Sequence, residues 1–270
     1  MKTLSNHTIL FDAECPMCKF YTKAFVATGM LDSDGRASYQ QMPGSVCSFV
    51  DLQRAVNEIA LVNNSTGEVS YGVQSLFKII GLSFPIFKPL FAFGPFVWLM
   101  SKVYAFISYN RRVIIPACNT GFSVQPAFKL HYRIAYLLLT WFCTGFILTH
   151  YAPLLTGLVP LGNPYREYLI CGGQIIFQAV AISLYARPKM WEYLGNVMTI
   201  SFAGSLLLLP GMVAGKLLDH SPLVFTAYFM VIAGLMFLEH IRRSKLLGLG
   251  IIMTCSWVIY RLLVLFIISN

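Results

Sequence analysis

The segment ILFDAECPMCKF, residues 9–20, places two cysteines three residues apart directly after a short apolar run. Residues 7–12 are rich in branched and aromatic side chains, so they predict a short buried strand. The proline after the first cysteine suits the first turn of a helix, and the next apolar residues recur at three- and four-residue spacing. We therefore expect a strand followed by a helix, with Cys15 at the helix N-terminus and Cys18 one turn further along.

Turn residues divide the remainder of the first half into further short elements. We expect strands at 37–42, 58–62 and 69–72, a hairpin turn at 63–68 and a closing helix at 73–82. The resulting order is strand, helix, strand, helix, strand, strand, helix, which predicts an α/β thioredoxin-like N-terminal domain with one core. The first helix, which begins at Pro16, is expected to be amphipathic, with one face formed by Met17, Phe20, Tyr21, Ala24, Phe25 and Thr28.

A cysteine at a helix N-terminus is well placed to be a thiolate. The positive end of the helix dipole and the unpaired N–H groups there lower its pKa, so Cys15 is the expected nucleophile. Cys18 lies one turn along the same face and can resolve a mixed disulfide by attacking Cys15. Two other interpretations are a pair of buried inert thiols and half of a zinc site. Zinc needs four ligands, and His7 and Cys47 lack ligand spacing, so we favour a redox pair and expect no metal.

Asp12 stands three residues before Cys15, at the end of the expected strand. A partly buried carboxylate there can accept a proton from Cys18 during resolution. Alternatively, Asp12 caps the N-terminus of the helix that carries the cysteines, which would stabilise that helix by about 1 kcal/mol. Glu14 is nearer to the helix start, and we expect it to be solvated.

The composition indicates a membrane protein. The chain has 270 residues, of which 57% are hydrophobic and 11% charged, whereas soluble domains carry about 25% charged residues. A net charge of +9 can indicate nucleic-acid binding, but the basic residues lie beside apolar segments. Membrane topology explains that clustering better, so we expect a lipid bilayer, and no nucleic acid, as a partner. The opening residues MKTLSNHTILFDAEC lack the apolar run of a signal peptide, and we expect none.

Long apolar runs fill the second half of the chain, whereas most Asp and Glu lie in residues 1–133. A transmembrane helix needs about 20 apolar residues. Five segments meet this description: 134–154, 168–186, 194–214, 223–240 and 246–268. We therefore expect a thioredoxin-like domain at 1–116, a linker at 117–133 and an all-α transmembrane bundle at 134–270. Residues 76–108 are also apolar, but lysines, prolines and glycines interrupt them, which favours short helices on the domain or in the membrane interface.

Basic residues predict the orientation of the bundle. On the side that includes the N-terminal half lie nine: Arg111, Arg112, Lys129, Arg133, Arg187, Lys189, Arg242, Arg243 and Lys245. The opposite side carries two, Arg166 and Lys216, each near an acidic residue. Positively charged loops remain in the cytoplasm, so the N-terminal domain is expected there and the C-terminus outside. We expect the membrane to be a bacterial inner membrane.

Several polar residues fall within or beside the expected spans. Arg261 lies near the middle of the last one, where an arginine usually faces a bundle interior, a cavity or a partner. It either contacts an anionic or quinone ligand, or pairs with a tyrosine, or extends to the interface. Glu239 and His240 are expected in an interfacial salt-bridged cluster with Arg242 and Arg243. Solvated positions are expected for the other polar residues in this half: His150, Asp219 and His220.

The chain has seven cysteines, an odd number without the layout of a disulfide scaffold. Cys143, Cys171 and Cys255 fall within spans, where we expect them to act as small apolar residues or, if they converge, as a second thiol relay. Cys118 lies between the two halves, and it can alternatively form a mixed disulfide with the first pair.

The segment ILFDAECPMC resembles the Asp-x-x-Cys-x-x-Cys opening of the DCC family, also called DUF393, a group of predicted thiol–disulfide oxidoreductases. The stretches EIALVNNSTGEVSYGVQSLFKII and VYAFISYNRRVI resemble later parts of that family. The resemblance covers residues 7–116 and implies a thioredoxin-like fold with Asp12, Cys15 and Cys18 as its signature. The spans resemble DoxX-type membrane redox modules in length and in the basic loop after the second helix. Unlike ordinary thioredoxins, the segment AVNEIALV carries no proline before the strand expected to face the cysteines.

Together these features predict a membrane-anchored, cytosol-facing thiol–disulfide oxidoreductase. Cys15 attacks, Cys18 resolves and Asp12 assists the proton transfer, while the spans anchor the domain. The expected partners are a protein thiol or disulfide and, as an electron partner near Arg261, a membrane quinone. The alternative is a non-enzymatic membrane protein, such as a transporter subunit or an assembly factor, whose domain senses redox state or binds a partner. A metal-binding tether is the third hypothesis.

Overall fold

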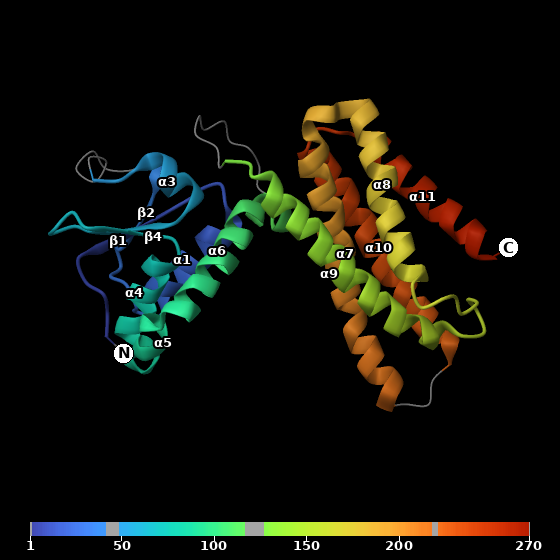
Figure 1. Ribbon diagram of the computed structural model, residues 1–270, viewed down its shortest axis with the longest axis horizontal. Coiled ribbons are helices and arrows are strands. Elements are labelled where there is room, and N and C mark those ends of the chain that lie inside the picture. The colour runs from blue at the N-terminus through green and yellow to red at the C-terminus, as the bar shows by residue number, and fades with distance from the viewer. Residues whose placement is uncertain (1, 42–48, 117–126, 218–220, 270) are drawn as a thin grey trace. The chain divides into compact units, whose positions relative to one another are not determined.

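The computed structural model of the protein describes residues 2–41, 49–116, 127–217 and 221–269. The chain forms two compact units, residues 1–132 (unit 1) and 133–270 (unit 2), each with its own core (Figure 1). Unit 1 combines a small mixed sheet with helices, and the described part of unit 2 is helical. The sequence predictions that lie outside the described residues concern Cys47, Cys118, Asp219, His220 and most of the expected linker.

Four strands form the sheet of unit 1: β1 His7–Phe11, β2 Arg36–Ser38, β3 Ala60–Asn63 and β4 Val69–Tyr71. Their order is β2-β1-β3-β4, with β1 parallel to β2 and antiparallel to β3, and with β3 antiparallel to β4. Because β1 lies inside the sheet and both of its faces are covered, Ile9 and Leu10 are fully buried. Val62 pairs with Val69 across the hairpin that joins β3 to β4.

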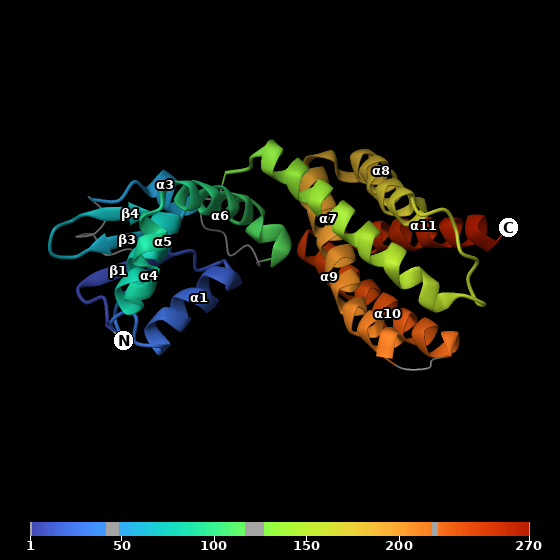
Figure 2. The ribbon, with the colours of Figure 1, turned by 60° about the horizontal axis from the view of Figure 1, so that its bottom comes forward.

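The helical elements of unit 1 are α1 Pro16–Ala27, η1 Tyr39–Gln41, α3 Leu52–Asn57, α4 Val73–Ser83, η2 Pro85–Phe87, α5 Lys88–Ala92 and α6 Gly94–Ile114, where η1 and η2 are 3-10 turns. Successive residues of a strand face opposite sides, so the sheet has a core on each face. Ile9 and Leu61 pack against side chains of α1, α4 and α6. Figure 2 shows the backbones of these helices beside the sheet. Leu10 and Val62 pack on the other face with residues of α3 and η1. The central strand β1 is thereby fixed on every side.

The order of strands and helices up to α4 is the one that the sequence predicts, except that residues 39–41 of the predicted strand 37–42 form the turn η1. The prediction of short helices at 76–108 is wrong in part, because α6 has 21 residues. The predicted inner face of α1 is wrong in part, because Phe20 is 78% exposed whereas Cys18 and Thr22 are buried. A buried threonine is tolerated here since its hydroxyl donates to the Cys18 carbonyl oxygen at 2.7 Å. An internal hydrogen bond removes the cost of burying a polar group, so spacing of apolar residues alone does not identify the inner face.

The described helices of unit 2 are α7 Leu130–Tyr151, which begins at the boundary with unit 1, α8 Arg166–Ala186, α9 Met190–Leu217, α10 Pro222–Leu246 and α11 Ile252–Ser269. Among the described residues, three helical segments are long and apolar enough to cross a membrane: 130–155, 166–215 and 222–246. A fourth candidate lies in unit 1, where the segments 85–92 and 94–114 pass the same test only as a pair that is bent by 91°. The second of the three segments includes α8 and most of α9. The two helices are separated at Ala186, whose backbone leaves the helical conformation (φ −154°, ψ 63°) before the short turn η4 Arg187–Lys189. The apolar part of α11 is shorter, at 252–268.

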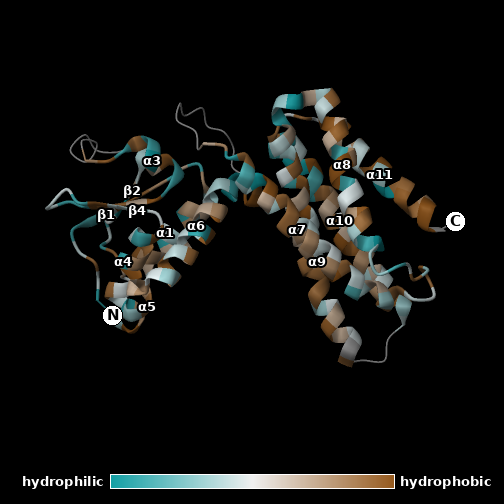
Figure 3. Cartoon of the chain, viewed as in Figure 1, coloured by the Kyte–Doolittle hydropathy of each residue, from teal (hydrophilic) through white to brown (hydrophobic). Residues whose placement is uncertain are grey.

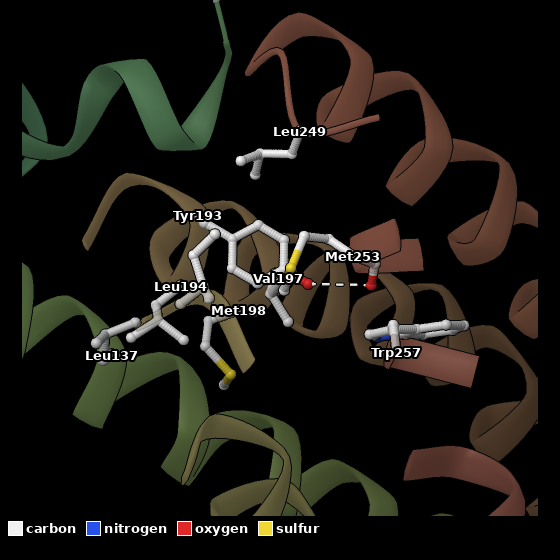
Figure 4. Packing of buried hydrophobic residues seen from close by; sticks show 9 residues of the cluster. Leu137, Tyr193, Leu194, Val197, Met198, Leu249, Met253 and Trp257 are labelled. Atoms are coloured by element: carbon white, nitrogen blue, oxygen red, sulfur yellow. Dashed lines mark hydrogen bonds between the residues drawn. The ribbon is translucent and has the colours of Figure 1, made fainter. Parts of the chain in front are cut away.

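The helices of unit 2 pack through a core formed by α7, α8, α9 and the segment that carries α11. Figure 4 shows Tyr193, Val197 and Met198 of α9 in this core with Met253 and Trp257 of α11. Hydrophobic residues also run along the outer surfaces of these helices (Figure 3). Large exposed apolar side chains there include Leu169, Leu184, Met230, Leu238 and Ile259. Exposed apolar surface of this extent indicates contact with a lipid bilayer.

Ile79 of α4 is fully buried against the sheet, whereas Ile86 of η2 is 82% exposed. We expect Ile79→Ala to destabilise unit 1 by about 2–5 kcal/mol, because it removes apolar contacts and leaves a cavity. Ile86→Ala, the same change on the surface, is expected to have little effect on stability. The measurement is the urea dependence of Cys18 alkylation in the full chain, since that buried thiol becomes reactive when unit 1 unfolds. Equal midpoints for the two variants would contradict the described packing of α4.

Candidate functional site

Cys15 is the residue that caps the N-terminus of α1. Its backbone is extended (φ −89°, ψ 110°), its N–H donates to the Asp12 carbonyl oxygen at 3.1 Å, and Pro16 is the first helical residue. The Cys15 sulfur accepts a hydrogen bond from the backbone N–H of Cys18 at 3.4 Å. The sulfur therefore occupies the place of a capping side-chain oxygen, where a negative charge is stabilised by free N–H groups and the helix dipole. The predicted positions of both cysteines on the helix are confirmed.

The two thiols are buried, and their pKa values differ. Cys15 is 3% exposed and Cys18 is 5% exposed, and neither forms a disulfide. The hydrogen bond that the Cys18 thiol donates and, to a smaller extent, the positive charge of Arg111 together lower the pKa of Cys15 to about 6, against the opposing effect of burial. The same hydrogen bond and burial raise the pKa of Cys18 well above its ordinary value. The site thus has a thiolate at Cys15 and a protonated thiol at Cys18 near neutral pH.

Asp12 is buried at the end of β1, where three donors surround its carboxylate. Oδ1 accepts from the Glu14 backbone N–H at 2.9 Å and from Nε2 of Gln40 at 2.8 Å. Oδ2 forms an ion pair with Nη2 of Arg111 at 2.8 Å. The hypothesis that Asp12 caps α1 is wrong, because Cys15 fills that position. Its carboxylate instead holds the guanidinium that lowers the pKa of Cys15.

Arg111 is a site residue that sequence reasoning did not assign. It lies in α6, 99 positions after Asp12, and Nη2 also donates to the Val56 carbonyl oxygen at 2.9 Å. The adjacent Asn110 donates to the carbonyl oxygens of Phe106 and Tyr132 at 2.9 and 3.0 Å. These bonds give a structural reason for the Asn-Arg pair in VYAFISYNRRVI. An unpaired charge inside a domain is costly, so a buried aspartate next to the cysteines is a signal to search for a distant arginine.

Glu14 forms a second ion pair with α6. Its carboxylate lies 3.0 Å from Nη2 of Arg112, and its side chain is only 2% exposed, so the prediction that Glu14 is solvated is wrong. The side chain is buried because Arg112 balances its charge. Both arginines are therefore engaged inside unit 1 and do not act as free charges beside a membrane span. Removing them from the nine basic residues of the predicted cytoplasmic side leaves seven.

Arg261 lies in α11 of unit 2, and unit 1 contains the two cysteines. Its guanidinium lies over the ring of Trp257, with Cζ 5.1 Å from the ring centre, one helical turn away. Pairing with a tyrosine was one of the three predicted alternatives, and the observed aromatic contact is instead with a tryptophan at i−4. Nε of Arg261 is buried and has no hydrogen-bond partner among the described residues. The ligand hypothesis for Arg261 stays a prediction.

His240 differs from its predicted setting at the membrane surface. Glu239 does form the expected salt bridges, at 2.6 Å to Arg242 and 2.7 Å to Arg243. His240 is instead buried between helices, where Nε2 lies 3.1 Å from the Tyr193 hydroxyl and Nδ1 lies 3.0 Å from the Thr254 hydroxyl. Adjacent residues of a helix point in different directions, so one can lie in the interface while the next enters the core.

The remaining cysteines of unit 2 lie on different helices. Cys143 is in α7, Cys171 is buried in α8 and Cys255 is exposed on α11, and all three are free. Within the described residues, His, Cys, Asp and Glu side chains form no group of three or more that could hold a metal ion.

Comparisons with protein-family models, with curated proteins and with solved structures find no match to this chain. The functional argument therefore depends on the chemistry of the site itself. Its central elements are a capping thiolate at Cys15, a protonated neighbour at Cys18 and a buried ion pair between Asp12 and Arg111.

The pH dependence of alkylation tests the asymmetry of the two thiols. We expect the rate at Cys15 to rise with a midpoint near pH 6, because the thiolate is the reactive form and predominates above the pKa. Cys18→Ala removes the thiol hydrogen bond, so the midpoint should move to higher pH. Asp12→Asn should move it to lower pH, since the Asp12 charge raises the pKa of Cys15. Peptide mass spectrometry measures each rate, and shifts of the same sign in both variants would contradict this account.

The ion pair between Asp12 and Arg111 is expected to be essential for stability. Arg111→Met leaves a buried carboxylate without its counter-charge, which costs about 3–5 kcal/mol. The double variant Asp12→Asn/Arg111→Met should recover most of this loss because no unpaired charge remains. The matched control is Arg54→Met, which breaks an exposed pair with Glu58 at 3.3 Å and is expected to cost less than about 1 kcal/mol. Urea unfolding of the full chain, followed by Cys18 alkylation, compares all three, and a double variant as unstable as Arg111→Met would refute the argument.

Proposed function

We propose that the protein is a membrane-anchored thiol–disulfide oxidoreductase whose unit 1 is a thioredoxin-like domain of the DCC type. The observation that carries the proposal is the capping position of Cys15, which stabilises its thiolate beside a protonated Cys18. The order β2-β1-β3-β4, with one parallel and two antiparallel pairings and helices on both faces, supports the thioredoxin-like assignment. A dithiol placed where a strand leads into a helix is the arrangement that this chemistry needs.

The reaction transfers two electrons from the dithiol to a substrate disulfide. The Cys15 thiolate attacks one substrate sulfur, a Cys15–substrate disulfide forms, and the other substrate sulfur leaves as a thiolate. Cys18 then loses its proton and attacks the Cys15 sulfur, which forms the Cys15–Cys18 disulfide and releases the second substrate thiolate. The released thiolates take up two protons in all, one of them from Cys18. A reduced partner, either a dithiol protein or a membrane quinol, must return two electrons before the next cycle.

Arg111 and Asp12 have complementary parts in this mechanism. Arg111 favours the negative charge on Cys15 before the attack, and its charge also favours deprotonation of Cys18 during resolution. Asp12 holds the guanidinium through the 2.8 Å ion pair and is the candidate acceptor for the Cys18 proton. Tyr21, whose hydroxyl lies 3.8 Å from the Cys18 sulfur, adds a weak hydrogen bond to the same thiol.

The lowered pKa of Cys15 also affects the reduction potential. A stabilised thiolate favours the reduced form, and this makes the disulfide form a stronger oxidant. In a reducing cytoplasm, the pair would rest as a dithiol and give electrons to disulfides or other oxidants.

Unit 2 is the proposed anchor, with α7–α11 forming five spans. The shortest helix, α11, has 18 residues, and a helix of that length extends about 27 Å, close to the hydrocarbon core of about 30 Å. The seven remaining basic residues of one side against two on the other support a cytoplasmic unit 1 in a bacterial inner membrane. A membrane quinone that contacts Arg261 in its reduced quinol form is the proposed electron donor within the bilayer, because the buried Nε there lacks a partner among the described residues.

One observation favours a second candidate function. Cys15 is almost completely buried, which restricts access by a folded protein disulfide. A buried, low-pKa thiol remains accessible to small oxidants, so unit 1 would then sense redox state for a membrane assembly factor or transporter subunit.

A redox titration of the full chain in detergent tests the proposal. Cys15 and Cys18 are followed by alkylation and mass spectrometry across thiol buffers of known potential. We expect one two-electron transition, in which a tenfold change in the oxidised-to-reduced ratio corresponds to about 30 mV. Cys15→Ser or Cys18→Ser should abolish it, whereas Cys143→Ser, which changes a thiol of unit 2, should not.

The assay of function is the reduction of insulin disulfides with dithiothreitol as electron donor. Turnover that disappears in Cys15→Ser supports the oxidoreductase. A dithiol transition without turnover, together with rapid oxidation by hydrogen peroxide, supports the sensor. If no transition occurs at any biological potential, both functions are refuted.

A further inference from the structure

Exposed large apolar side chains are concentrated on η2, α5 and the first half of α6 in unit 1, and together they are called the apolar surface. Its exposed side chains include Ile86, Phe87, Leu90, Phe93, Trp98 and Leu99. Two of them are exceptionally open, with Ile86 82% and Trp98 64% exposed. Together they form a group of large apolar residues on consecutive elements, which marks an interaction surface more than a set of scattered hydrophobic residues.

A stacked aromatic core fixes the shape of this surface. The ring of Phe77 in α4 stacks on Phe91 of α5 with centres 4.2 Å apart, and on Phe96 of α6 at 5.8 Å. The chain bends by 91° between the η2–α5 segment and α6. Aromatic contacts on both sides of the bend fix its angle, so the positions of the exposed residues on η2, α5 and α6 are defined by the packing beneath them.

A groove of about 590 Å³ opens beside this core. Apolar side chains of α4, α5 and α6 line it, among them Phe77, Leu82, Phe91 and Val97, and Lys78 and Lys88 provide the charged groups of the lining. Its volume is within the range of about 300–1,000 Å³ that is typical of ligand sites. An apolar groove with two lysines suits an amphiphile that has an acyl chain and an anionic head.

The charged residues of the segment 69–166, which includes this surface, are all basic. No acidic residue occurs between Glu68 and Glu167, whereas Lys78, Lys88 and Lys102 lie on α4, α5 and α6. Lys78 has a partial partner in Glu68 at 3.4 Å. Lys102 lies over the ring of Trp98, with Nζ 5.9 Å from the ring centre. Lysine beside exposed tryptophan and phenylalanine is the composition of segments that lie in the membrane interface.

The second half of α6 belongs to the interior of unit 1. Tyr104 accepts a hydrogen bond from the Ile59 backbone N–H at 2.8 Å, Arg111 pairs with Asp12, and Val113 is fully buried. A helix surrounded by lipid along its whole length cannot also make these contacts. Only its first half is therefore free to meet a membrane.

We propose that η2, α5 and the first half of α6 dock on the anionic surface of the bilayer, with the acyl chain of an anionic lipid in the groove. The same chain carries helices apolar enough to cross a membrane, so a bilayer surface lies within reach of unit 1. The lysines and the absence of acidic residues favour a negatively charged lipid surface over a second copy of this basic protein, whose own surface would repel it. This docking is independent of the thiol chemistry.

Photo-crosslinking in nanodiscs tests the proposal with the full chain. The probe is a phosphatidylglycerol with a diazirine on its acyl chain, compared with the equivalent phosphatidylcholine, and crosslinked peptides are quantified by mass spectrometry. Crosslinks to α10 serve as the internal reference for membrane insertion. We expect crosslinks at residues 84–102 and at groove residues with phosphatidylglycerol, and few with phosphatidylcholine.

Charge reversal gives the matched variants. Lys88→Glu and Lys102→Glu should each lower the crosslinks at 84–102 by at least about fivefold relative to α10, because losing one lysine near an anionic surface has about that effect and the new glutamate is also repelled. Lys19→Glu and Lys23→Glu, on the exposed side of α1, should leave them unchanged. Crosslinks that do not depend on the lipid headgroup or on these lysines would overturn the proposal. So would crosslinks along the whole of α6, or protein–protein crosslinks between copies through this surface.

Discussion

The ion pair between Asp12 and Arg111 is the interaction on which the organisation of unit 1 depends. It joins the end of the central strand to the helix that closes the unit, and it does so beside the two cysteines. Neither charge would be tolerated alone at this depth, so the position of α6 and the conformation of the loop before α1 depend on each other. The same guanidinium that neutralises Asp12 also favours a thiolate at Cys15. One ion pair therefore both joins α6 to the end of β1 and supplies the charge that lowers the pKa of Cys15.

The electrostatic design of the site follows from local geometry and long-range packing together. The helix N-terminus gives Cys15 free backbone donors, and the i+3 spacing brings the Cys18 N–H to its sulfur. These features are encoded within a few residues. The positive charge near the thiols belongs to Arg111 of α6, near the end of the unit. Hydrogen bonds that involve Gln40 and the Val56 carbonyl hold Arg111 and Asp12 in place. A dithiol in an isolated helix would have the backbone donors of the helix N-terminus but would lack the positive charge of Arg111.

Most of the element order in unit 1 and the position of Cys15 at the N-terminus of α1 could be predicted from the sequence, because turn residues, a proline and short apolar runs are local signals. The capping role of the Cys15 sulfur was not predicted, since Asp12 was the candidate cap. The partners of Asp12 and Glu14 could not, since an ion pair across about a hundred residues leaves no local pattern. The inner face of α1 and the burial of His240 were mispredicted for a related reason. Thr22 and His240 are polar, yet each finds a hydrogen-bond partner inside the protein, and such compensation is invisible in a hydropathy pattern.

Because α6 is the last described helix that lies wholly within unit 1, its late synthesis affects the order in which the unit folds. The contacts of Tyr104 and Arg111 complete the core of unit 1, yet the strands they cover are synthesised much earlier. Leu130, where the first apolar helix of the second half begins, lies only 16 residues beyond the end of α6 at Ile114. Domains fold in order as the chain emerges from the ribosome. The last step in folding unit 1 therefore falls close in time to the emergence of a segment that needs the membrane.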